Sequence, residues 1–140
     1  MNALRAIYRF WMALVVLAVL VQIGAAGYGA FDSANHLKDK GDTYGHEGFE
    51  DAWNFHTGLG WLTVYGILLA LLFALLARVG RPRIWWQLGL AVAAIAQALF
   101  AFLGEDHPAT GFLHPLNALV ILALSGLLAR GAWRPAAVAA

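Results

Sequence analysis

The sequence has no cysteine and little charge. The lack of cysteine in 140 residues excludes disulfides, thiolate metal sites and covalent attachment of a c-type haem. Charged residues make up 12% of the chain, against about 25% in soluble domains. The net charge of +1 is too small to indicate binding of nucleic acid. Hydrophobic residues instead reach 61%, compared with roughly 45–50%. This composition predicts an integral membrane protein with a single domain that comprises residues 1–140.

Four apolar segments each approach the roughly 20 residues that cross a bilayer as a helix. They cover residues 8–30, 55–77, 84–103 and 112–128. Between them lie two predicted outer loops, 31–53 and 104–111, and a basic turn in which Pro82 ends any continuous helix. A signal peptide is the alternative for the first segment, but its apolar run exceeds the roughly 7–15 residues of a signal core. The pattern predicts an all-α, up-down-up-down four-helix transmembrane bundle.

The arginines indicate the orientation of this bundle. All seven lie before or at the start of the first segment, between the second and third, or after the fourth. Cytoplasmic flanks attract arginine and lysine, which places both termini and the basic turn inside. Lys38 and Lys40 oppose this rule, but arginine dominates the count. We expect a multi-pass protein of a bacterial-type inner membrane with both termini cytoplasmic and a frayed tail over residues 130–140.

Two histidines, His56 and His114, open apolar segments at matching places. An ionisable residue at a membrane boundary needs a partner or a role, and neutral imidazole is a good iron ligand. We therefore predict a haem b iron held between them. The alternative is that each is an interfacial residue bonded to a loop carbonyl. Gly60 and Ala118 follow at i+4 on the same helix face, where a small side chain leaves room for a flat macrocycle.

The first two segments resemble the last two. Gln22 lies deep in the first segment and Gln97 deep in the third, each followed by small and aromatic residues, an acidic outer loop and then a histidine. This indicates an internal pseudo-twofold repeat of two hairpins. The two glutamines either bond each other, a haem propionate or a loop, or they join helices to each other. Asn117, one turn from His114, has the same interpretations.

The remaining histidines lie in the predicted outer loops: His36, His46 and His107. Carboxylates nearby would complete a metal site of imidazole and carboxylate: Asp32, Glu47, Glu50 and Asp106. A solvated loop is the favoured interpretation because glycines interrupt this stretch. Of the three histidines, His107 is expected nearest the haem edge because its loop is short. Trp53 and Trp61 flank His56 and are expected to pack on the haem.

The stretches Gln22-Ile23-Gly24 and His56-x-x-x-Gly60, with Gln97 and His114-x-x-Asn117-Ala118, resemble one half of the haem A synthase family. In that family each four-helix half carries a histidine pair at its outer side. The chain is also similar to small four-span bacterial membrane proteins with a His-Pro-x-Asn-Ala element. The resemblance covers most of the chain and implies haem b bound between His56 and His114.

The chain departs from that family in length and in its catalytic residue. It has half the length of a haem A synthase, and only Glu47 or Glu50, by location alone, stands in for the family's catalytic glutamate. Haem binding therefore carries over from the resemblance, and haem A synthesis does not.

Two functions follow from these observations. Bis-histidine ligation leaves no open iron position, which favours a b-type cytochrome that relays electrons with a quinone or a redox partner near the outer face. The alternative is a haem-free four-span scaffold, a transporter subunit, or a proton- or metal-sensing membrane protein. The lipid bilayer is the expected partner in both cases, nucleic acid is not, and a homo-oligomer is compatible with either.

Overall fold

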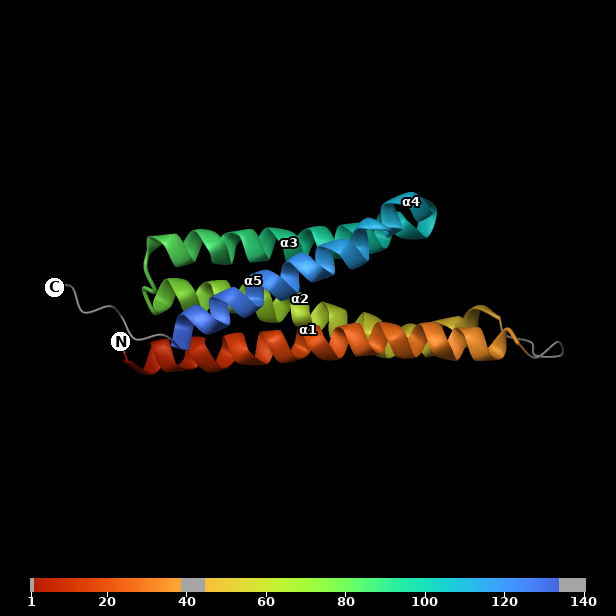
Figure 1. Cartoon of the computed structure of the whole chain (residues 1–140), viewed down its shortest axis with the longest axis horizontal. Helices are drawn as coiled ribbons and strands as arrows, with labels where there is room; N and C mark the ends of the chain where they lie inside the picture. The colour runs from red at the N-terminus through yellow and green to blue at the C-terminus, as the bar shows by residue number, and fades with distance from the viewer. Residues whose placement is uncertain (1, 39–44, 134–140) are drawn as a thin grey trace.

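The computed structural model describes residues 2–38 and 45–133, which fold into five helices. These are α1 (Asn2–His36), α2 (His46–Leu76), α3 (Arg81–Asp106), α4 (Pro108–Gly111) and α5 (Leu113–Trp133). The four long helices lie along one another, with the N-terminus and the α2–α3 turn at one end and α4 at the other (Figure 1). All four are long and apolar enough to cross a membrane. The predicted all-α four-helix transmembrane bundle is confirmed.

The four long helices form a closed square. α1 contacts α2 and α5, and α3 contacts the same two helices. Within the described residues the backbones of α2 and α5 do not approach each other closely, so these two helices occupy opposite corners of the bundle. This matters for function because His56 lies on α2 and His114 on α5. Any contact between the two histidines therefore runs across the centre of the bundle.

The helices extend beyond the boundaries that hydropathy predicts. Residues 31–36 and 46–53, expected in an outer loop, continue α1 and α2. The second expected outer loop, 104–111, contains the end of α3 and the single turn α4, and α5 continues to Trp133 rather than fraying from residue 130. The parts of the expected loop and tail at residues 39–44 and 134–140 lie outside the described residues.

The additional turns make α1 and α2 longer than a bilayer core requires. At 1.5 Å per residue the 35 residues of α1 span about 52 Å, well beyond the roughly 30 Å of a bilayer core. Figure 1 shows the α1–α2 hairpin extending past α3 and α4. Contacts between the two helices stabilise this extension, because Trp53 Nε1 donates to Ser33 Oγ at 3.3 Å and Gly29 lies directly against the Trp53 ring. Hydropathy predicts only the apolar part of such a hairpin and leaves its polar turns unassigned.

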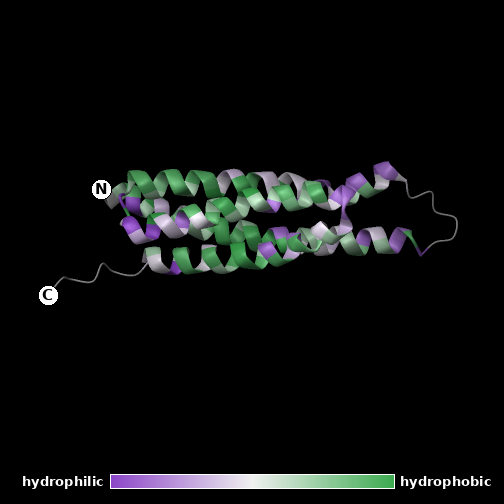
Figure 2. Ribbon diagram, turned by 90° about the horizontal axis from the view of Figure 1, so that it is seen from above, coloured by the Kyte–Doolittle hydropathy of each residue, from purple (hydrophilic) through white to green (hydrophobic). Residues whose placement is uncertain are grey.

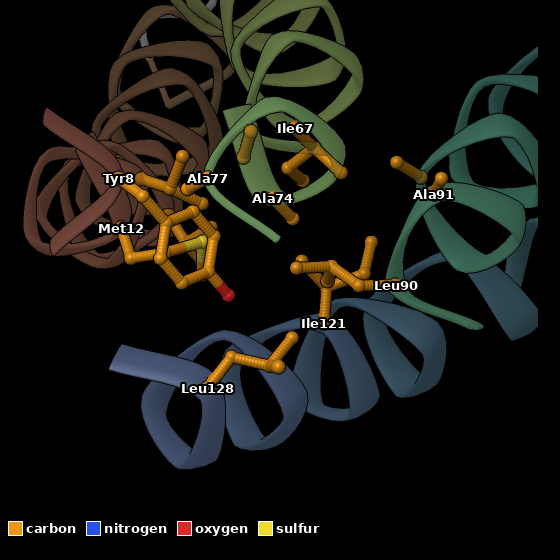
Figure 3. Packing of buried hydrophobic residues seen from close by; sticks show 13 residues of the cluster. Tyr8, Met12, Ile67, Ala74, Ala77, Leu90, Ala91, Ile121 and Leu128 are labelled. Carbon is orange, nitrogen blue, oxygen red and sulfur yellow. The ribbon is translucent and has the colours of Figure 1, made fainter. Parts of the chain in front are cut away.

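Small side chains occupy the centre of the bundle. Ala70 and Ala74 of α2 and Ala94 of α3 are fully buried, and small residues let helix backbones approach closely in a membrane. Larger side chains fill the remaining space, among them Met12 of α1 and Leu90 of α3 (Figure 3). Large apolar residues on the outer faces are exposed, and Figure 2 shows an apolar middle between polar ends. This distribution suits a lipid environment.

At the C-terminus of α2, in the turn to α3, Arg78 adopts the left-handed backbone conformation. The Val79 amide donates to the Ala74 carbonyl at 3.2 Å and the Arg78 amide donates to the Leu75 carbonyl at 3.1 Å. This pair of bonds is a Schellman motif, in which the residue at the Arg78 position is usually glycine. Arg78 has φ 49°, a conformation that costs a non-glycine residue roughly 1–2 kcal/mol.

Arg78→Gly should therefore raise the free energy of unfolding by about 1 kcal/mol, because glycine adopts this conformation without the steric cost. Thermal unfolding in detergent, followed by circular dichroism, measures the change. Arg81→Gly is the matched control, since Arg81 is helical and exposed and should gain nothing. Equal shifts in the two variants would contradict the assignment of strain to Arg78.

The arginine distribution predicts that the α2–α3 turn is cytoplasmic and α4 external. The absence of native cysteine makes single-cysteine variants a clean probe, and Arg81 and Ala109 are exposed at the two ends. In intact cells a membrane-impermeant maleimide should label Ala109→Cys and should label Arg81→Cys only after permeabilisation. The reverse pattern would show that the orientation is inverted.

Candidate functional site

The side chains of His56 and His114 lie next to each other inside the bundle. Their ring centres are 6.1 Å apart and the ring planes make an angle of 61°. Both histidines are partly buried. His114 is the second residue of α5, as the sequence suggests, but His56 lies ten residues into α2 rather than at its start. The rings meet because α2 begins well outside the bundle and α5 begins at its edge.

Each histidine contacts a backbone carbonyl of the preceding long helix through the same ring atom. His56 Nδ1 lies 3.2 Å from the Gln22 carbonyl, and His114 Nδ1 lies 3.0 Å from the Gln97 carbonyl. A carbonyl oxygen only accepts hydrogen bonds, so Nδ1 is the protonated nitrogen in both rings. In a neutral ring, Nε2 then carries the free lone pair. No described residue forms a hydrogen bond with either Nε2 atom.

The amide side chains near the two histidines differ between the two halves. Gln22 Nε2 donates to the His56 carbonyl at 2.7 Å, so α1 and α2 are joined by two bonds between the same two residues. In the second half, Asn117 Nδ2 donates to Gln97 Oε1 at 2.7 Å and to the Ala93 carbonyl at 2.8 Å. Gln22, Gln97 and Asn117 thus join neighbouring helices, and the two glutamines do not bond each other.

A pocket of about 230 Å³ opens between the four long helices at the two histidines. Its walls are mostly apolar and include several small residues: Gly60, Ala94, Ala98, Ala101 and Ala118. Gln22 and Gln97 also line it, whereas Asn117 is not among the lining residues. Gln22 Oε1 is buried there without a hydrogen-bond partner among the described residues. Such atoms are uncommon in native proteins, and this one leaves the pocket with an unused acceptor.

Gly60 of α2 lies directly against the Gln22 side chain of α1, beside the pocket. A Cβ atom at this position would lie 3.0 Å from Gln22 Nε2. Glycine at position 60 therefore lets the Gln22 amide reach the His56 carbonyl. Ala118 lines the opposite wall, on α5. Both residues are thus at the pocket, with Gly60 supporting the histidine's partner as well as leaving space.

Two tryptophans accompany His56. The Trp53 ring packs edge-on against the imidazole at 5.5 Å between ring centres. Trp61 lines the pocket and is partly exposed. Trp53 therefore restricts the orientation of the His56 ring from the outer side, and Trp61 forms part of the wall.

The other histidines lie away from the pocket. His107 is exposed between α3 and α4 and does not line the pocket, so the expectation that it comes near the site has no support from its placement. His36 and His46 are helical rather than in a loop, with Asp32 and Glu50 at 4.0 Å and 3.2 Å respectively. Within residues 2–38 and 45–133, no group of three or more such side chains is close enough to hold a metal ion.

Glu105 is a pocket residue that sequence reasoning did not identify. It lines the pocket together with Gln97 and Ala101, and these residues are spaced by four along α3. Positions i and i+4 lie on one helix face, so the spacing from Gln97 was the available signal. Placing residues 104–111 in a loop concealed it, because Glu105 then fell outside the predicted helix.

Comparisons with protein-family models, with curated proteins and with solved structures find no match to this chain. The resemblance to the haem A synthase family thus stays a prediction from the short stretches around the glutamines and histidines. The geometry of the pocket has to carry the functional argument.

Gly60→Ala should disturb the Gln22–His56 contact, because the added methyl group displaces the Gln22 amide from the His56 carbonyl. We expect a loss of about 1 kcal/mol in the free energy of unfolding, the size of a typical interhelical hydrogen bond in a membrane protein. Thermal unfolding in detergent measures it. Gly58→Ala is the matched control, since a Cβ there meets nothing within 4 Å. Equal effects in both variants would show that close approach at Gly60 is unimportant.

Proposed function

We propose that the protein binds one haem b between His56 and His114 and transfers electrons through it. The observation that carries the proposal is the paired geometry of the two histidines. Their rings are neighbours in one pocket, and each has its Nδ1 bonded to a carbonyl. Metal-binding histidines commonly use one ring nitrogen in this way, which fixes the tautomer and leaves the other nitrogen for the metal.

The distance between the rings suits a shared metal ion. Metal–imidazole bonds are about 2.0–2.1 Å long and a ring nitrogen lies about 1.1 Å from its ring centre, so two imidazoles on opposite sides of one ion have centres about 6.3 Å apart. The observed separation is 6.1 Å. The angle of 61° between the planes is no obstacle, because two imidazoles that bind one ion need not be coplanar.

The donor set favours haem over a bare metal ion. A structural zinc ion takes about four protein ligands, and the described residues hold no cluster of three or more suitable side chains. A haem would require only one or two protein ligands for its iron, and His56 and His114 would supply them. The two histidines, from helices on opposite corners of the bundle, would thus supply the ligands that a haem iron needs from the protein.

The pocket accommodates part of such a group. Its volume of about 230 Å³ is below the roughly 300–1,000 Å³ of typical ligand pockets. A haem therefore requires its rim to extend past the partly exposed side chains of Trp61 and Phe102. The small residues on the walls, which include Gly60 and Ala118, are consistent with a flat ligand.

The residues of this chain hold and insulate the proposed group. The backbone carbonyls of Gln22 and Gln97 accept hydrogen bonds from the Nδ1–H groups of His56 and His114. The hydrogen bond from Asn117 to the Ala93 carbonyl joins α5 to α3. The mostly apolar walls would exclude water from a bound group. A bound haem would supply reversible one-electron chemistry, and with both axial positions filled it would favour electron transfer over reaction with oxygen. The donor and acceptor are proposed to be a quinone or a protein at the outer side of a bacterial-type inner membrane.

His56→Gly and His114→Gly test this function. Each variant, purified in detergent with added haemin, should lose the low-spin six-coordinate spectrum of the wild type because one axial ligand is missing. Added imidazole should restore that spectrum, since a free imidazole can enter the space of the deleted ring. Optical absorption in the oxidised and reduced states measures both effects.

His46→Ala and His107→Ala are the controls, because both side chains are exposed and neither lines the pocket. They should leave the spectrum unchanged. If neither the wild type nor the two variants bind haemin, and His56→Gly and His114→Gly only lose thermal stability, the histidines simply join helices. The haem-free scaffold, transporter or sensor function would then replace the cytochrome.

A further inference from the structure

The end of the bundle that holds the chain's N-terminus is strongly positive. The six described arginines all lie there: Arg5, Arg9, Arg78, Arg81, Arg83 and Arg130. The described carboxylates lie toward the opposite end, in residues 32–51 and 105–106. None of these arginines forms an ion pair with a carboxylate among the described residues. Two helices begin and two end at this end, so their dipoles largely cancel and the positive charge remains.

Three of these arginines surround the last turn of α5. Arg83 of α3 donates from Nη2 to the Gly131 carbonyl at 2.7 Å. The guanidinium of Arg9, on α1, lies over the Trp133 ring at 4.9 Å from its centre. Arg130 belongs to the same turn and is exposed. The guanidinium groups of Arg83 and Arg9 thus lie against the helical turn that carries Arg130.

Most hydrogen-bond donors of this cluster have no partner among the described residues. A guanidinium group carries five N–H donors, and Arg83 uses one of them here while Arg130 uses none. Arg9 Nε is buried without any hydrogen-bond partner among the described residues. Arginine donors arranged in this way suit the oxygens of a phosphate, which they bind through paired hydrogen bonds.

Apolar surface adjoins the cluster on the lipid side. The rings of Phe10 and Trp133 meet edge-on with centres 5.3 Å apart. Phe10 is 58% exposed and Trp133 is 49% exposed. A ligand that combines a phosphate with hydrocarbon would contact both the guanidinium groups and these rings. Free phosphate would use only the former.

We propose that Arg9, Arg83 and Arg130 bind the headgroup of an anionic phospholipid, with its acyl chain against Phe10 and Trp133. The site is independent of the histidine pocket, which lies toward the opposite end of the bundle. Basic pockets between transmembrane helices are a common way to hold anionic headgroups. The lipid neutralises arginines that the chain itself leaves unpaired.

Native mass spectrometry of the full-length protein, titrated with phosphatidylglycerol in a neutral detergent, tests the site. The wild type should bind one phosphatidylglycerol more tightly than phosphatidylcholine. Arg9→Gln and Arg130→Gln should each weaken phosphatidylglycerol binding about fivefold, the effect expected for one arginine near an anionic lipid. Arg130 is exposed and forms no side-chain hydrogen bond or ion pair with other described residues, so Arg130→Gln should fold normally even if Arg9→Gln is less stable.

Arg78→Gln is the matched control, since Arg78 lies at the same end but in the α2–α3 turn. It should leave the affinity for phosphatidylglycerol unchanged. Equal weakening by Arg78→Gln would overturn the local site in favour of a diffuse positive surface. Equal binding of both lipids, or full competition by inorganic phosphate at the same concentration, would also overturn the proposal. Loss in Arg9→Gln and Arg130→Gln alone would support it.

Discussion

The hydrogen bond between a histidine Nδ1 and a backbone carbonyl is the interaction on which the site depends. An imidazole in an apolar bundle has two nitrogens to satisfy, and an unsatisfied polar group in lipid costs several kcal/mol. His56 and His114 each satisfy Nδ1 with a glutamine carbonyl of the preceding long helix. The same bond joins two helices, fixes the tautomer and leaves Nε2 available. Helix association therefore uses one nitrogen of each ring, and the proposed haem would use the other.

The arrangement of the helices converts these two local bonds into one site. Because α2 and α5 occupy opposite corners, their histidines approach each other only at the centre, where small residues leave a pocket. The repeat of two hairpins explains why the bonds are alike, since each half contributes a glutamine and a histidine. The halves differ in their amides: Gln22 bonds the His56 backbone, whereas Gln97 receives a bond from Asn117. The repeat is therefore one of backbone geometry more than of side chains.

Sequence patterns predicted the four spans and the main residues of the pocket, because lipid imposes long apolar helices and because a histidine in such a helix is rare. They did not predict the polar turns of α1 and α2, since helix stability there comes from contacts such as Trp53 with Ser33. That error placed His56 at a helix start, and the placement of residues 104–111 in a loop hid Glu105, which belongs to α3. The bonding of Nδ1 was also beyond the sequence, because it depends on the register between neighbouring helices. The two glutamines were noticed for their side chains, and their carbonyls turned out to contact the histidines.

The most direct test of the proposed bis-histidine haem is the reduced-minus-oxidised absorption spectrum of the wild-type protein, purified in detergent and supplied with haemin. Two axial imidazoles predict binding of one haem per chain and the sharp bands of a low-spin, six-coordinate iron in both oxidation states. A protein that retains no haem after excess haemin is removed, or that binds haem only in a high-spin form, would contradict ligation by His56 and His114.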